Sequence, residues 1–151
     1  RHLRIKDGAL WCLYQKSRGG RRGDTTDPRQ LHSLPVRDVD GTPMEWNLQA
    51  RIAAGDELPP LREPGKAAQA LTDNLKRRTV WKQLKAEAEH IGEQLTSYSF
   101  RHRYAKECHA RAIPLADIAF AMGHTIDTHW MSYARFQPST TARAFAKAAA
   151  P

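Results

Sequence analysis

Alternating apolar and polar residues at the start of the chain predict a β-hairpin. Residues 3–6 alternate in this way, Asp7-Gly8 is a tight-turn signal, and residues 9–14 suit a pleated surface. A third short strand is expected at residues 31–36. This part of the chain therefore predicts a small three-stranded antiparallel sheet.

After this sheet the apolar positions follow a helical spacing. Thr42 and Glu45 have the spacing of a capping box, and Pro43 stands at the first helical position. Gly55 is a helix stop signal. These signals predict a helix over residues 43–54.

Residues 57–65 contain three prolines and predict a linker or surface loop. Residues 67–91 favour helix by composition, and an interruption near residues 77–79 leaves open whether they form one long helix or two. Five apolar residues of this segment are compatible with one buried stripe: Leu71, Leu75, Leu84, Ala88 and Ile91.

The last third of the chain predicts a series of short helices. Four residues recur at helical spacing in the first of them: Phe100, Tyr104, Cys108 and Ala112. Pro114 ends that helix and starts another, which stops at Gly123. Further helices are expected over residues 126–135 and, after Pro138, over residues 140–149.

The pattern as a whole predicts a mixed α+β fold, mostly helical, with the small sheet packed against a helical body. With 151 residues and 40% hydrophobic content, the chain is long enough for one compact domain with a real core. We expect a β-sheet with a basic loop over residues 1–37, a helical body over 38–138 and a C-terminal helix or tail over 139–151.

Charge adds a preference for a polyanionic partner. Lys and Arg outnumber Asp and Glu by 24 to 16, which favours DNA, RNA or a membrane surface without choosing among them. Four cations lie in the glycine-rich loop before the third strand: Lys16, Arg18, Arg21 and Arg22. For such a run taken alone, a solvated loop kept soluble by its charge is the better interpretation.

The apolar stretches are short and interrupted by charges, so we expect no membrane-spanning segment and no secretory signal. Cys12 and Cys108 form neither a disulfide framework nor a paired zinc spacing. These features predict a cytoplasmic protein with no membrane partner. Because the chain opens with Arg1 and enters a strand at once, we expect it to be a piece excised from a longer protein.

The candidate chemistry lies near the C-terminus. Tyr98-Ser-Phe-Arg101 is followed by Gly123-His124 and then by Tyr133, nine residues past the histidine. Cleavage of a phosphodiester without a metal needs a nucleophile, cations that bind the non-bridging oxygens, and an acid for the leaving oxygen. The chain contains a residue of each type.

These residues resemble the catalytic domain of the tyrosine recombinases, also called phage integrases. Their motif is His-x-x-Arg at a helix start, then Gly-His, then a nucleophilic Tyr nine residues after that His. The resemblance is specific over residues 96–136 and weaker elsewhere. That family also carries a lysine between the second and third strands of a three-stranded sheet, and Lys16 matches it here.

The resemblance implies a role for each matched residue. Tyr133 attacks the scissile phosphate and becomes linked to a DNA 3′ end, which releases a 5′ hydroxyl. Arg101 binds a non-bridging oxygen through its planar fork of donors. His124 hydrogen-bonds the phosphate or helps to remove the phenolic proton, and Lys16 protonates the leaving 5′ oxygen. Tyr98 replaces the motif's histidine and can donate one hydrogen bond to a phosphate but carries no positive charge.

The implied function is site-specific DNA breakage and rejoining, as in integration or excision of a mobile element. It needs no cofactor and no metal. Contacts to double-stranded DNA are expected from five cations: Lys16, Arg18, Arg21, Arg22 and Arg103. The full-length protein is expected to be nucleoid-associated and to form a tetramer on DNA, with the helix over residues 140–149 as one route to assembly. The family's further essential arginine is expected upstream of Arg1.

Two alternatives stay open. Taken alone, Tyr133 is more often a half-buried helix aromatic, His124 a helix cap and Arg101 a surface cation. The helices over residues 100–112 and 114–122 also resemble a helix-turn-helix, as in a DNA-binding protein without catalysis or a degenerate integrase remnant. A metal site is the other alternative, but its five candidates have no recognised zinc spacing: His102, Cys108, His109, His124 and His129.

Overall fold

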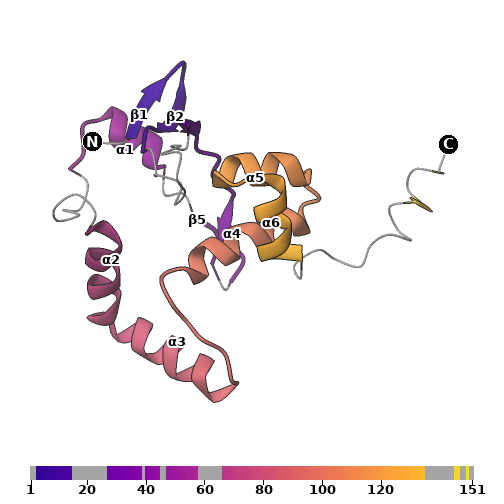
Figure 1. Cartoon of the computed structure of the whole chain (residues 1–151). Coiled ribbons are helices and arrows are strands. Elements are labelled where there is room, and N and C mark those ends of the chain that lie inside the picture. Colours follow the sequence, from indigo (N-terminus) through magenta and orange to yellow (C-terminus); the bar gives the residue numbers. More distant parts are fainter. Residues whose placement is uncertain are drawn as a thin grey trace, which may run out of the picture. The chain divides into compact units, whose positions relative to one another are not determined.

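A computed structural model describes residues 3–14, 27–38, 40–44, 47–57, 66–134, 145, 146 and 149. The chain divides into two compact units, one made of residues 1–56 and 105–151 and the other of residues 57–104. Figure 1 labels the helices of both and some of the strands. The single domain expected over residues 1–151 stays a prediction.

The N-terminal hairpin is confirmed. Strand β1 (Leu3–Lys6) pairs antiparallel with β2 (Ala9–Cys12). Between them Asp7 has φ 50° and Gly8 φ 70°. Positive φ at both central residues defines a type I′ turn, whose twist matches that of the flanking strands. The register places Ile5 opposite Leu10, the buried residue of the sheet.

The third strand exists, but its predicted position was wrong. β3 (Arg29–Gln30) pairs antiparallel with β2 and begins two residues before the expected segment at 31–36. Pro35 lacks an N–H to donate to a ladder, which disfavours a strand through the expected segment. The chain instead forms β4 (Val36–Arg37), which pairs with β5 (Pro43–Met44) in a separate two-stranded sheet.

The start of the first helix was also predicted wrongly. Residues 43 and 44 belong to β5, and α1 spans Leu48–Ala53. The Asp40 carboxylate accepts a hydrogen bond of 2.8 Å from the Thr42 amide, and Thr42 in turn accepts one of 2.9 Å from the Asp38 amide. Because Thr42 is held in this turn, its capping-box spacing is not used.

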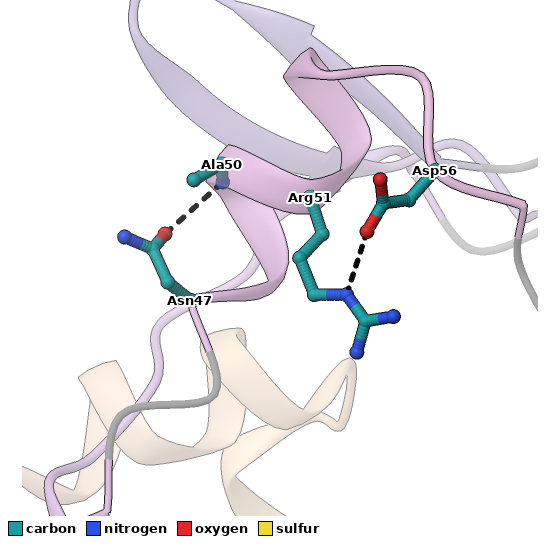
Figure 2. Close-up of polar contacts among 4 residues, drawn as sticks. All are labelled: Asn47, Ala50, Arg51 and Asp56. Carbon is teal, nitrogen blue, oxygen red and sulfur yellow. Dashed lines mark hydrogen bonds and ion pairs between the residues drawn. The ribbon is translucent and has the colours of Figure 1, made fainter.

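Asn47 caps α1 instead. Its side-chain oxygen accepts a hydrogen bond of 3.0 Å from the Ala50 amide, as Figure 2 shows. At the other end Arg51 Nε lies 2.9 Å from the Asp56 carboxylate. Gly55 adopts φ 78° just beyond the helix, so the predicted helix stop is confirmed.

Residues 67–91 form two helices, which decides between the two alternatives. They are α2 (Ala67–Lys76) and α3 (Thr79–His90), and neither contains a buried residue. The expected buried stripe was therefore wrong: Leu71, Leu84 and Ile91 are exposed. Spacing fixes which residues share a helix face, but burial requires a second surface against that face.

Three of the four helices expected over the last third are confirmed as α4 (Ser99–Ala110), α5 (Leu115–Met122) and α6 (Ile126–Tyr133). Most buried residues of the chain's described part come from them: Ala105, Cys108, His109, Ile118, Ala119, Met122, His129 and Tyr133. Helices α5 and α6 pack side by side (Figure 1). The core of the unit of residues 1–56 and 105–151 therefore lies where α5, α6 and the second half of α4 meet.

The predicted α+β fold class, mostly helical with a small three-stranded antiparallel sheet, is confirmed. The helix expected over residues 140–149 lies outside the described residues except at positions 145, 146 and 149. In the part of the chain that the structure describes, no helix has the length and apolar character needed to span a bilayer.

Candidate active site

His124 and Tyr133 lie against each other in the helical core. Their ring centroids are 5.8 Å apart and their ring planes differ by 18°, so the two side chains are stacked. Gly123 closes α5 in the left-handed conformation, with φ 68°, and the His124 amide donates 2.8 Å to the Ala119 carbonyl. This helix stop turns the chain so that His124 faces the end of α6, where Tyr133 lies.

His129 is the third ring of this cluster. Its centroid is 4.7 Å from that of Tyr133 and 6.0 Å from that of His124. His129 and Tyr133 are one helical turn apart on α6, which brings their rings together on one face. Thr125 fixes the start of α6, since its hydroxyl accepts a hydrogen bond of 3.2 Å from the Thr128 amide.

Burial is the property that limits what Tyr133 can do in this conformation. Its exposed fraction is 1%, and that of His129 is 0%. The phenol is therefore enclosed by protein, and attack on a DNA phosphate would require α6 or its surroundings to move. His124 is only partly buried and lies nearer to solvent.

Behind the Tyr133 ring, His129 contacts a second buried histidine from α4. The Nε2 atoms of His109 and His129 are 3.1 Å apart, so one ring donates a proton and the other accepts it. Burial lowers the pKa of His109 below its ordinary range. The uncharged form of His109 is therefore favoured over that of an ordinary histidine.

Tyr98 and Arg101 form a separate contact at the start of α4. The Arg101 Cζ atom lies 5.9 Å from the centre of the Tyr98 ring, in cation–π geometry. Tyr98 also meets His102 edge to face at 5.1 Å. Tyr98 is 54% exposed, whereas Arg101 is partly buried in the first turn of the helix.

The structure thus brings the predicted residues together in two pairs, Tyr98 with Arg101 and His124 with Tyr133. The first pair belongs to the unit of residues 57–104 and the second to the unit of residues 1–56 and 105–151. Arg103 is an exposed cation on α4. The remaining predicted site residues lie outside the described residues: Lys16, Arg18, Arg21 and Arg22.

Sequence reasoning missed one further residue, Arg29. Its guanidinium lies over Gly123, since a Cβ atom placed on Gly123 would be 3.1 Å from Arg29 Nη1 and 3.2 Å from Cζ. Arg29 comes from β3, and β3 contacts α5. An arginine in a short polar segment carries no sequence signal, so only the tertiary contact identifies it.

The alternative of a metal site finds no support in the described ranges. There, no group of three or more His, Cys, Asp or Glu side chains could hold a metal ion. His109 and His129 contact each other directly.

Comparison with known proteins gives no match to a protein-family model, a curated protein or a solved structure.

Proposed function

We infer that this chain belongs to a protein that breaks and rejoins DNA strands at specific sites, with Tyr133 as the nucleophile. The observation that carries this inference is the stacking of His124 on Tyr133. Two residues nine positions apart in the motif are brought into direct contact by the stop at Gly123 and the length of α6. An imidazole beside a phenol is suited to accept its proton or to bind the phosphate it attacks.

In the proposed reaction Tyr133 Oη forms a bond to the phosphorus while the bond from phosphorus to the 5′ oxygen breaks. The phenolic proton passes to His124 or to solvent, and Lys16 donates a proton to the leaving 5′ oxygen. Arg101 binds a non-bridging oxygen as negative charge builds there. Attack of another 5′ hydroxyl on the phosphotyrosine reverses these steps and rejoins the strands without ATP.

Because Tyr133 is almost fully buried, the proposed activity requires that DNA binding expose its hydroxyl group. We expect the enclosed phenol to be the resting conformation, with DNA binding moving the end of α6 so that the hydroxyl reaches a phosphate.

The direct test is trapping of a covalent protein–DNA adduct. The protein is incubated with nicked duplexes whose central base pairs are randomised, because a nick lets the cleaved fragment diffuse away and prevents rejoining. We expect an adduct that survives denaturant, with DNA linked through its 3′ phosphate to the peptide containing Tyr133. Tyr133→Phe should abolish it. An adduct that persists in Tyr133→Phe contradicts the proposal.

The burial of Tyr133 also favours a second candidate, a DNA-binding protein without catalysis. In that case Tyr133 is a core aromatic and the positive charge of the chain serves phosphate contacts alone. The same experiment separates the two functions. If the protein binds duplexes in a salt-sensitive way but forms no adduct with any sequence in the pool, the result supports the second candidate.

A further inference from the structure

We propose that Arg29 is a phosphate-binding residue of the same site, placed beside His124 by its contact with Gly123. The identification of its ligand as the scissile phosphodiester rests on the proposed function. The evidence lies within the unit of residues 1–56 and 105–151, which holds Arg29, Gly123, His124 and Tyr133.

The contact with Gly123 is close, and the left-handed backbone there, with φ 68°, favours a glycine. A Cβ atom at this position would lie 3.1, 3.2 and 3.4 Å from the Nη1, Cζ and Nε atoms of Arg29. The flat guanidinium therefore rests on the backbone at the end of α5. His124 is the next residue along the chain, so Arg29 brings a positive charge next to the histidine that stacks on Tyr133.

The position of Arg29 is fixed by the sheet. Its backbone pairs with Cys12 of β2, and two residues later the Leu31 amide donates a hydrogen bond of 2.7 Å to the Leu10 carbonyl. Leu10 is buried, and β3 contacts α5. A cation carried by a paired strand is better preorganised than one on a long loop, which is what stabilisation of a developing charge requires.

The hydrogen bonding of Arg29 is incomplete in the protein itself. Its Nε atom is buried and has no hydrogen-bond partner among the described residues. A guanidinium stays charged at every physiological pH, and a buried donor of a charged group is costly unless something accepts from it. Such an unsatisfied group in a folded protein calls for an explanation. An anion bound to the guanidinium supplies one if a small shift of the side chain opens the Nε atom to it.

A phosphodiester fits this site by its chemistry. Its two non-bridging oxygens match the planar fork of an arginine, which can bind them with two parallel hydrogen bonds. The partly buried His124 adds a further ring nitrogen beside the same position. Arg29 and His124 would then hold the phosphate on the side of the site formed by the end of α5, with Tyr133 behind His124.

Titration with inorganic phosphate tests the site without requiring cleavage. The histidine Cε1–H signals of the whole chain are followed by NMR, with that of His124 assigned from His124→Asn. We expect phosphate to shift the His124 signal. Arg29→Gln should weaken phosphate binding by about tenfold, because it removes charge-assisted hydrogen bonds. Arg29→Lys, which keeps the charge and loses the fork, should give an intermediate loss.

The matched control is Arg4→Gln, which removes the same charge from an exposed position on β1 of the same sheet. It should leave phosphate binding within about twofold of the unchanged protein, because its charge is exposed on a strand not paired with β3 and is screened by salt. Equal weakening in the Arg4 and Arg29 variants would show a general charge effect and overturn the proposal. Arg29→Lys keeps the test valid if Arg29→Gln fails to fold.

The same variants in the adduct experiment separate this proposal from the proposed function. If no adduct forms in any variant but phosphate binding needs Arg29, the anion site stands and the cleavage function fails. If the adduct forms equally in Arg29→Gln, the assignment of Arg29 fails while the cleavage function stands. If phosphate binding does not depend on Arg29, the assignment fails whether or not an adduct forms. We expect adduct formation and phosphate binding to fall together in Arg29→Gln and to persist in Arg4→Gln.

Discussion

The Nε2 atoms of His109 on α4 and His129 on α6 are 3.1 Å apart in the buried core. Only one of the two nitrogens can carry the proton that joins them, so the contact requires at least one uncharged ring. His129 also stacks on Tyr133 at 4.7 Å. The protonation of this pair is therefore linked to the packing around Tyr133.

Stability should depend on pH through His109. Burial lowers the pKa of His109 in the folded protein below its ordinary value of 6.5. As pH falls below about 7, the unfolded chain takes up this proton before the folded chain does, so the free energy of unfolding decreases. The decrease ends once pH passes below the folded pKa. Urea unfolding at a series of pH values measures it.

In the His109→Gln variant this part of the pH dependence should disappear. His90→Gln is the control, because His90 is exposed at the end of α3. We expect the His90 variant to follow the unchanged protein. An unaltered pH profile in His109→Gln would show that the dependence comes from another group.

Replacement of Gly123 by alanine should have two effects. The left-handed backbone, with φ 68°, costs an alanine about 1–2 kcal/mol of unfolding free energy. The new methyl group should also push the Arg29 guanidinium away by a few tenths of an ångström. Phosphate binding should therefore weaken along with stability, as measured by urea unfolding and the phosphate titration.

Gly92→Ala is the matched control for Gly123→Ala. Gly92 has φ 75°, and a Cβ atom there would meet nothing within 4 Å. It carries the same backbone cost without the contact to Arg29, so its phosphate affinity should not change. If both variants bind phosphate equally well, the contact between Gly123 and Arg29 has no part in anion binding.

The cap of α1 should contribute measurably to local stability. Asn47→Ala removes the acceptor for the Ala50 amide and should cost about 0.5–2 kcal/mol. The helix has six residues, so hydrogen exchange of the Ala50 amide should accelerate more than global unfolding does. Asn47→Asp keeps an acceptor and should exchange as slowly as the unchanged protein. If hydrogen exchange of the Ala50 amide is unchanged in Asn47→Ala, the Asn47 side chain does not stabilise the start of α1.

The core where α5 meets α6 should be sensitive to loss of volume. Ile118 is 1% exposed, and Ile118→Ala should lower the free energy of unfolding by about 2–5 kcal/mol. Ile126 on α6 is 50% exposed, so Ile126→Ala should cost much less. Urea unfolding compares the two variants. Equal losses would mean that Ile118 does not lie in the principal core.

The role proposed for Lys16 predicts a chemical rescue. If Lys16 protonates the leaving 5′ oxygen, Lys16→Ala should lose cleavage by about 10²-fold or more on ordinary DNA. Sulfur in place of the bridging 5′ oxygen is a better leaving group and needs no proton, so cleavage should recover on that substrate. Arg18→Ala keeps the proposed acid, Lys16, so any loss of cleavage in this variant should not be recovered on the sulfur-containing substrate. If cleavage by Lys16→Ala does not recover on the sulfur-containing substrate, Lys16 contributes to DNA binding and is not the acid.

Local signals in the sequence determined most elements of this protein. Asp7-Gly8 predicted the tight turn of the hairpin, and Pro114 and Gly123 predicted where α5 begins and ends. These residues restrict or permit particular backbone angles regardless of their surroundings. The spacing from His124 to Tyr133 also marked two residues that prove to be in contact. Local backbone preference acts over a few residues and can be read without the fold.

Only the tertiary structure decided how the helices are covered and which side chains meet. Leu71 and Leu84 follow a helical stripe yet are exposed, and Thr42 has a capping spacing yet lies in a turn, because burial and pairing depend on distant partners. The enclosure of Tyr133, the pairing of His109 with His129 and the contact of Arg29 with Gly123 join separate elements. Such contacts arise from packing between elements, which no short segment of the sequence encodes.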